Sequence, residues 1–242
     1  MKIKTKFSRL LDFVKSNKIT FYLWYRLYRK NRGVKINWFN KDTVFLIDGY
    51  PRSGNTFIQM LIKNVFAGIE TVHHLHSIGA IKISLAKGLP SFIIYRDPKH
   101  AVSSNYLKEY SFITDQINIE KINSDLLNYS LNYYIQFYRY VVKNDAVILI
   151  SFDKLIREPE SVIKAINNRI PSSYKRNEND ILHIVSEIKD RSFGAKDKLG
   201  SSRPSEVKEK LKKNLIKHLT AFENLKLANQ LYEKLKVAPN NV

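Results

Sequence analysis

The chain has 242 residues, of which 41 are Lys or Arg and 22 are Asp or Glu, so its formal net charge is +19. This length suits one α/β domain with a short extension and excludes two large domains. A content of 44% apolar and 12% aromatic residues excludes a disordered chain. The absence of cysteine excludes disulfides, thiolate metal sites and cysteine nucleophiles, and it fits a cytoplasmic protein.

Residues 1–42 are expected to form a basic amphipathic helical extension. They contain twelve Lys or Arg and two Asp, and therefore carry +10 of the net charge. Apolar residues recur twice at i, i+3, i+4 and i+7, which predicts two short helices with basic opposite faces. The two apolar sets are Phe7, Leu10, Leu11 and Val14, and Phe21, Trp24, Tyr25 and Tyr28. These helices either pack on the domain, which is the simpler interpretation, or make a peripheral contact with anionic lipid.

Residues 43–242 are expected to form a single α/β domain. Runs of Val, Ile, Leu and Phe alternate with helical segments, which predicts a parallel sheet with helices on both faces, in three layers. Strands are predicted at 43–47, 91–95 and 146–151, and helices at 56–66, 101–110, 121–143 and 159–170. Two helical faces stand out, namely Phe57, Met60, Leu61 and Asn64, and Ala228, Leu231, Tyr232 and Leu235. No segment is apolar enough to span a membrane, and an export signal is not expected.

The first predicted strand is followed by a Gly-rich loop, GYPRSGN, and then by a helix. Gly49 and Gly54 are separated by four residues and followed by Asn55 and Thr56. This is the layout of the phosphate loop G-x-x-x-x-G-K-[ST], except that Asn replaces the lysine and the cation lies inside the loop, at Arg52. Backbone N–H groups and a helix N-terminus converge on an oxyanion in such loops. The loop is therefore expected to hold a phosphate or phosphosulfate, although a plain strand-to-helix turn is the alternative at this point.

A second loop of this kind follows the strand at 91–95. Arg96 stands at the carboxyl end of the strand, and Ser104 lies eight residues later on the next helix. In an open α/β sheet ligands bind at the carboxyl ends of the strands, so both loops would lie on one edge. Two anion sites on one edge indicate a doubly phosphorylated nucleotide.

Together, GYPRSGNTF and YRDPKHAVSS resemble the two cofactor-binding motifs of the sulfotransferases that use 3′-phosphoadenosine 5′-phosphosulfate (PAPS). A third segment, FDKLIREPESVIKAI, is similar to a mainly structural segment of that family, so the resemblance runs from about residue 43 to 170. It implies a P-loop-like nucleotide-binding core that transfers a sulfuryl group from PAPS to an acceptor hydroxyl. The product would be 3′,5′-adenosine bisphosphate (PAP), and no metal is expected.

The resemblance also implies roles for individual residues. Those that would hold the 5′-phosphosulfate are Arg52, Ser53, Gly54, Asn55, Thr56 and Phe57. Arg52 would draw charge from the bridging oxygen as the sulfuryl group leaves, whereas Arg96 and Ser104 would bind the 3′-phosphate. The family's C-terminal Arg-Lys-Gly segment has no clean counterpart in this sequence, and Arg203 is the residue carried over for it.

Three of the six histidines lie in TVHHLHSIGAI. A metal site is disfavoured because the spacing is not i, i+4 and no nearby carboxylate or cysteine completes a ligand set. In the sulfotransferases the catalytic base lies in a His-Leu pair shortly before the arginine of the second motif, and His74-Leu75 stands 22 residues before Arg96. The resemblance therefore implies His74 as the base, with His76 second. If this segment is extended, His74 and His76 share a face and His73 points away.

The acceptor is not indicated by the sequence, although a saccharide or a glycolipid would fit the basic charge. Two other functions stay open. A P-loop kinase or nucleotide hydrolase is disfavoured by Asn55 in place of the lysine. A basic nucleic-acid-binding protein is disfavoured because the charge is concentrated at the two ends of the chain and no recognised binding motif accompanies it. The expected location is the cytoplasm, with a possible peripheral membrane contact through residues 1–42.

Overall fold

The computed structural model describes residues 14, 16–32, 38–66, 68–111, 122–171, 181–190 and 206–242. Within them, a four-stranded sheet has the order β2-β1-β3-β4, and neighbouring strands are parallel. The strands are β1 (Thr43–Gly49), β2 (Glu70–His73), β3 (Ser91–Tyr95) and β4 (Val147–Ser151). The sequence-based expectation of a parallel α/β sheet is confirmed.

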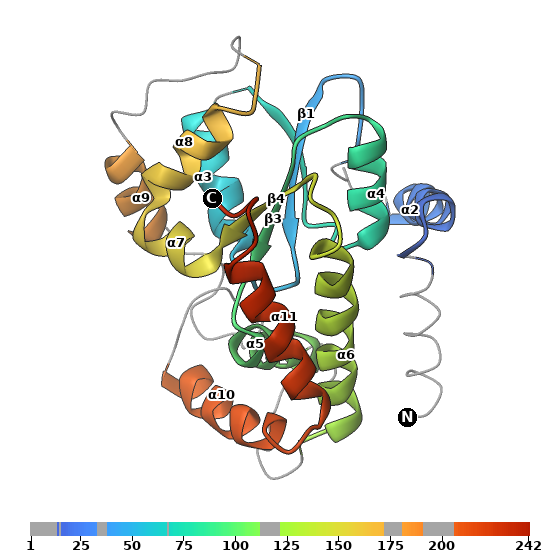
Figure 1. The fold of residues 1–242 in the computed structure, drawn as a ribbon, viewed down its shortest axis with the longest axis vertical. Helices are drawn as coiled ribbons and strands as arrows, with labels where there is room; N and C mark the ends of the chain where they lie inside the picture. The colour runs from blue at the N-terminus through green and yellow to red at the C-terminus, as the bar shows by residue number, and fades with distance from the viewer. Residues whose placement is uncertain are drawn as a thin grey trace.

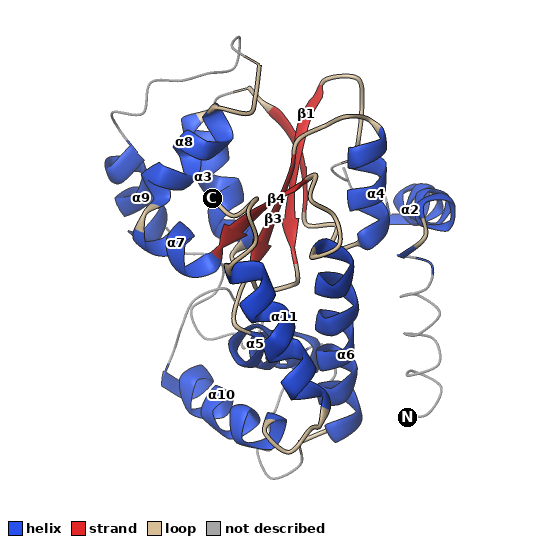
Figure 2. Cartoon of the chain, viewed as in Figure 1, coloured by secondary structure: helices blue, strands red, loops and turns tan. Residues whose placement is uncertain are grey.

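Helices cover both faces of this sheet, which lies between them (Figures 1 and 2). One group comprises α3 (Asn55–Val65), α7 (Phe152–Arg157), α8 (Pro159–Asn167) and α9 (Ile181–Asp190). The other comprises α4 (Ile78–Ala86), α5 (Pro98–Ser111), α6 (Ser124–Val141), α10 (Glu206–Leu219) and α11 (Asn224–Lys236). A further helix, α2 (Lys18–Arg32), packs on the outer side of α4. No helix in these described parts of the chain is long and apolar enough to cross a membrane.

Alternate side chains of the strands enter two separate cores, one on each face. Leu46 and Ile93 join the core formed with α4, α6 and α11, whereas Ile47 and Ile94 join the one formed with α3 and α8. All four side chains are buried. Burial of each of these side chains contributes about 1.5–3 kcal/mol to stability. A strand with consecutive apolar residues, which point to alternate faces, is therefore most stable when helices cover both faces of the sheet.

The helix after β1 buries a face that adjoins the side noted in the sequence and shares Leu61 with it. Its buried apolar residues are Ile58, Leu61, Ile62 and Val65, whereas Asn64 is exposed and donates to the Met60 carbonyl. The buried set is apolar at each of the positions i, i+3, i+4 and i+7, whereas the predicted set included a polar amide. The last helix follows expectation, since Ala228, Leu231 and Leu235 are buried.

The helix α2 corresponds to the second helix predicted in the N-terminal segment, and the first lies almost entirely outside the described residues. Phe21 and Tyr25 are buried and Trp24 is partly buried, so this face of α2 packs on the domain. The opposite face was predicted to be basic. It exposes Arg26 and also Ile19, Leu23 and Leu27, because a second apolar set with i, i+4, i+8 spacing lies among the basic residues.

The order of the strands determines where a ligand can bind. From β1 the chain moves to β2 on one side of the sheet, and from β3 it moves to β4 on the other side. The connections therefore diverge between β1 and β3, and this point at the carboxyl edge is the usual ligand-binding crevice of open α/β sheets. Gly49 at the end of β1 pairs with Ile94 of β3 there.

Candidate active site

The loop after β1 turns sharply into the N-terminus of α3. Arg52 and Gly54 both have left-handed backbone conformations, with φ of 69° and 97°. A Cβ at Gly54 would lie 2.9 Å from Cδ2 of Phe152, so glycine is required here both by the backbone and by the close approach of α7. The loop thereby places the N–H groups of the first turn of α3 at the carboxyl edge of the sheet.

Asn55 occupies the position of the phosphate-loop lysine, and its side chain turns back into the protein. It is buried, and its Nδ2 donates to the Tyr50 carbonyl at 3.1 Å. The amide therefore closes the loop by joining its first residue to the first residue of the helix. Because this side chain is short, buried and neutral, the loop has no cation at the lysine position.

A buried tyrosine of α6 holds the same loop against β3. The Tyr138 hydroxyl donates to the Ile94 carbonyl at 2.7 Å and lies 3.4 Å from the Tyr50 amide, which donates to it. Ser53 is fully buried, and its Oγ lies 3.5 Å from the same hydroxyl. Burial raises the pKa of Tyr138, so the phenol remains protonated. The Ser53 side chain thus faces the core, and only its backbone is left to contact a ligand.

The two predicted arginines and the predicted serine lie together at the carboxyl edge between β1 and β3. Arg52 Nε donates to Ser104 Oγ at 3.1 Å, and Arg96 Nη1 donates to the Arg52 carbonyl at 2.9 Å. From the family resemblance, Arg52 was expected at one anion site and Arg96 and Ser104 at a second site. In the structure the Arg52 side chain reaches the second site, where it contacts α5 through Ser104.

Both guanidinium groups are partly buried. Burial lowers the pKa of Arg52 and of Arg96, and the neighbouring Arg96 lowers that of Arg52 further. Arg96 Cζ lies 4.0 Å from the ring centroid of Phe152, which the sequence analysis did not single out. In the described part of the chain no carboxylate lies within ion-pair distance of Arg96, although Asp153 and Glu209 raise its pKa. Two neighbouring cations in such a setting favour the binding of an anion.

The three histidines lie at the end of β2 and in the turn after it, next to the loop after β1, with His73 as the last residue of the strand. The segment is not extended beyond β2, because His74 and His76 have φ of 58° and 47° and the chain turns at both. His73 therefore does not point away from the cluster: its Nδ1 lies 2.8 Å from Nδ1 of His74. The rings of His74 and His76 meet edge to face, 5.7 Å apart.

His73 and His74 belong to a hydrogen-bonded chain that leads to α3. Gln59 Nε2 lies 2.6 Å from His73 Nε2, and His74 Nε2 lies 3.3 Å from Thr56 Oγ1. With the Gln59 amide donating, His73 accepts at Nε2 and donates from Nδ1, and His74 then carries its proton on Nε2. Burial lowers the pKa of both rings to about 4, so both are neutral at pH 7. In this arrangement His74 is a donor that faces the first turn of α3.

His76 has different partners. Asp48, fully buried in β1, accepts from the His76 backbone amide at 2.6 Å and lies 3.1 Å from its ring Nδ1. The Gly49 carbonyl lies 2.7 Å from the same Nδ1. Because both neighbours are acceptors, the neutral ring carries its proton on Nδ1 and leaves the lone pair on Nε2. No residue of the described parts of the chain forms a hydrogen bond with that Nε2. The one carboxylate in an otherwise apolar strand was the signal that could have identified Asp48.

The remaining predicted residues have less distinct surroundings. Thr56 lies in the first turn of α3 beside His74. Phe57 is partly buried and packs against the core formed with α3 and α8. Arg203 lies outside the described residues. Among the described side chains no group of three or more His, Asp and Glu residues is arranged to hold a metal ion.

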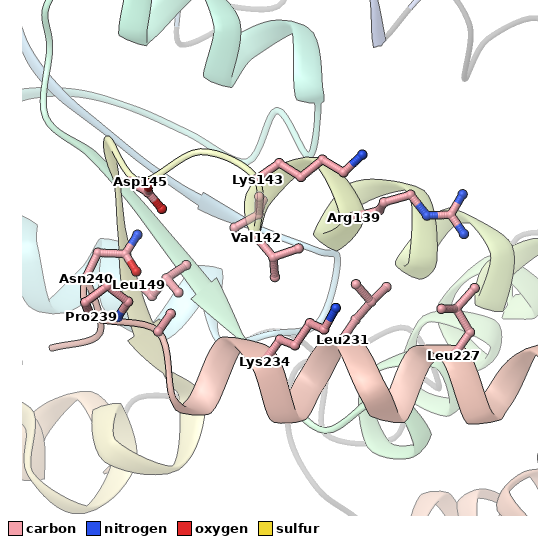
Figure 3. A pocket seen from close by; sticks show the side chains of 12 residues that line it. Arg139, Val142, Lys143, Asp145, Leu149, Leu227, Leu231, Lys234, Pro239 and Asn240 are labelled. Carbon is pink, nitrogen blue, oxygen red and sulfur yellow. The ribbon is translucent and has the colours of Figure 1, made fainter.

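A cavity of about 490 Å³ lies away from this edge, between α6 and α11 (Figure 3). Its floor includes Leu227 and Leu231, and its basic lining residues are Arg139, Lys143 and Lys234. None of the predicted site residues lines it. The candidate site is therefore the residue cluster at the carboxyl edge of the sheet and not this cavity.

No family model matches the chain, and no curated protein matches it in sequence. Among solved structures, the chain is similar to mouse sulfotransferase SULT7A1 complexed with PAP. The similarity covers 82% of this chain and 90% of that chain, with a TM-score of 0.46 and 12% sequence identity. A likeness this distant assigns no function to the chain.

Proposed function

We propose that this protein is a sulfotransferase that transfers a sulfuryl group from PAPS to an acceptor hydroxyl. The observation that carries the proposal is the meeting of Arg52, Arg96 and Ser104 between the carboxyl ends of β1 and β3. Two partly buried guanidinium groups next to a helix N-terminus suit a ligand with several negative charges. A nucleotide with a 5′-phosphosulfate and a 3′-phosphate is such a ligand.

The residues present fit this donor. The N–H groups at the start of α3 and the Arg52 guanidinium would hold the phosphosulfate, while Arg96 and Ser104 would hold the 3′-phosphate. Arg52 already donates to Ser104, so a bound phosphate would replace that contact and release Arg52 for the phosphosulfate. The stack of Arg96 on Phe152 keeps the second guanidinium in place while this exchange occurs.

Two histidines take separate roles in this proposal. When bound, PAPS supplies an activated sulfuryl group. His76 Nε2 accepts the proton of the acceptor hydroxyl, and Asp48 with the Gly49 carbonyl holds the ring through Nδ1, so that the lone pair on Nε2 stays available. His74 donates from Nε2 toward the first turn of α3, where negative charge is bound. The contacts thus favour His76 as the base, although the resemblance ranked His74 first.

Phosphoryl transfer from a nucleoside triphosphate is the alternative that the same loop permits. It is disfavoured because the side chain at the lysine position is a buried amide that bonds to the Tyr50 carbonyl. Without that lysine, the point charge that bridges β- and γ-phosphates is missing. The acceptor hydroxyl of the sulfuryl transfer is proposed to belong to a saccharide or a glycolipid, on account of the basic surface.

The test compares the thermal stability of the protein with PAP and with ATP·Mg²⁺. At a concentration of about 100 times its Kd, PAP should raise the free energy of unfolding by about 2.7 kcal/mol, a shift of several degrees in Tm. Selective stabilisation by ATP·Mg²⁺ would reject the proposal in favour of the alternative. A screen with radiolabelled PAPS over saccharides, lipids, phenols and peptides then identifies the acceptor.

A further inference from the structure

The helix α2 carries an exposed apolar stripe on the face that points away from the domain. Ile19 is 68% exposed, Leu23 is 52% exposed and Leu27 is 66% exposed. Spacings of four residues place these side chains in one row along the helix, and Tyr22 beside them is 42% exposed. Single exposed apolar residues are ordinary on protein surfaces, but a contiguous row on one helix marks a surface that another apolar phase covers.

The opposite face of α2 fixes the helix to the domain. Phe21 is buried, and Tyr25 stacks on Trp38 with ring centroids 4.2 Å apart. Figure 1 shows α2 on the outer side of α4, at the periphery of the molecule. The exposed row therefore cannot turn inward without loss of this aromatic packing, and it remains at the outer surface.

The charge around the row indicates what covers it. The sequence of α2, KITFYLWYRLYRKNR, contains five Lys or Arg and no acidic residue. Arg26 is exposed on the same face as the row, and Lys18 is exposed at the start of the helix. Residues 1–42 together carry +10. A second copy of this chain would bring the same positive charge against itself, whereas an anionic lipid surface offers both an apolar phase and opposite charge.

We propose that α2 binds an anionic lipid surface, with its axis in the plane of the interface. Ile19, Leu23 and Leu27 enter the boundary between headgroups and acyl chains, and Lys18 and Arg26 contact the headgroup phosphates. This proposal does not depend on the proposed sulfotransferase function, because none of these residues lies at the carboxyl edge of the sheet.

The chain has two tryptophans, Trp24 in α2 and Trp38 stacked on Tyr25 of the same helix, so native tryptophan fluorescence reports on this region alone. The full chain is titrated with vesicles of phosphatidylcholine and phosphatidylserine and with vesicles of pure phosphatidylcholine. We expect binding to the mixed vesicles, a blue shift of the emission, and weaker binding as salt is added. The double substitution Leu23→Gln and Leu27→Gln should weaken binding by about tenfold or more.

The matched control is Leu182→Gln on α9, which removes a side chain that is 67% exposed at a distance from α2. It should bind the mixed vesicles as the unchanged protein does, and the thermal midpoints of all variants should agree. Equal binding by the double variant, or equal binding to both kinds of vesicle, would overturn the proposal. So would a dimer in solution that the double variant converts to a monomer, because the row would then be a protein interface.

Discussion

The carboxylate of Asp48 accepts a hydrogen bond from the backbone amide of His76 and lies 3.1 Å from Nδ1 of the same ring. The two residues come from different parts of the chain, one from inside β1 and the other from the turn after β2. A buried carboxylate that holds both the backbone and the ring of a histidine fixes its orientation and its tautomer. Asp48 is therefore a positioning residue for the proposed base.

The substitution Asp48→Asn tests this role. An amide has one acceptor oxygen instead of two, so its NH₂ group would face either the His76 backbone amide or the ring Nδ1–H where a carboxylate oxygen now lies. We expect turnover with the acceptor found in the PAPS screen to fall by about 10²–10⁴-fold, while PAP still stabilises the protein. Nitrogen NMR of the histidine rings should show protonated Nδ1 in the unchanged protein and a shift toward protonated Nε2 in the variant. Asp145→Asn, at the distant cavity, is the control and should alter neither measurement.

Separate substitution of the two histidines distinguishes the base from the donor. His76→Ala should abolish transfer, because it removes the lone pair that accepts the proton. His74→Ala should reduce transfer by about 10²–10³-fold, the effect of one lost hydrogen-bond donor to developing charge. Both variants should keep the thermal shift with PAP. If His74→Ala abolished transfer and His76→Ala retained it, the base would be His74, as the family resemblance implies.

Substitution of Arg96 tests the anion site without any need for an acceptor. Arg96→Met keeps the length of the side chain and its contact with Phe152 but removes the charge. We expect PAP affinity to fall by about 10–10²-fold, because a charge-assisted hydrogen bond is lost. The thermal midpoint of the ligand-free protein should not fall, because the substitution relieves the repulsion between the guanidinium groups of Arg52 and Arg96. Arg157→Met, at an exposed position on α7, should leave both values unchanged, and equal loss in this control would contradict the site.

The sheet and the turns after β1 and β3 could be predicted from the sequence because both depend on local patterns. Continuous apolar runs identify buried parallel strands, and the glycines of the first loop identify a turn that other residues cannot adopt. The contact between Asp48 and His76 could not be predicted in this way, because it depends on the register between β1 and β2. The contact of Arg52 with Ser104 likewise depends on how far α5 lies from the loop and on one side-chain conformation.

The role of Tyr138 shows the same limit in the core. In the sequence it is one of several aromatic residues of α6, and nothing in its spacing separates it from them. Only the packing of α6 on the sheet brings its hydroxyl to Ile94, Tyr50 and Ser53. On α3 the difference is smaller, since Leu61 belongs to both the predicted and the buried set, and Phe57 and Met60 lie at the edge of the core.

Restoring the phosphate-loop lysine should destabilise the protein and not create a nucleoside triphosphatase. In Asn55→Lys the new ammonium replaces a buried amide that bonds to the Tyr50 carbonyl. The free energy of unfolding, measured in urea, should fall by about 1–3 kcal/mol, and ATP·Mg²⁺ should give no thermal shift. Asn64→Lys, on the exposed side of the same helix, should have little effect on stability. Stabilisation of Asn55→Lys by ATP·Mg²⁺ would show that the loop already has the geometry of a triphosphate site.

The neutral pair His73 and His74 makes stability depend on pH. Burial lowers the pKa of each ring from 6.5 to about 4, so the unfolded chain takes up protons first as the pH falls. The free energy of unfolding should therefore decrease as the pH falls from about 6.5 to about 4, by up to about 1 kcal/mol per pH unit for each ring. Above about pH 6.5 both rings are neutral in the folded and the unfolded chain, so their full contribution to stability is present there. Urea denaturation across the window should show a smaller slope for the double substitution His73→Asn and His74→Asn. His183→Gln, with a side chain 75% exposed on α9, should keep the slope of the unchanged protein, and an equal slope in the double variant would mean that the two rings are not buried as neutral groups.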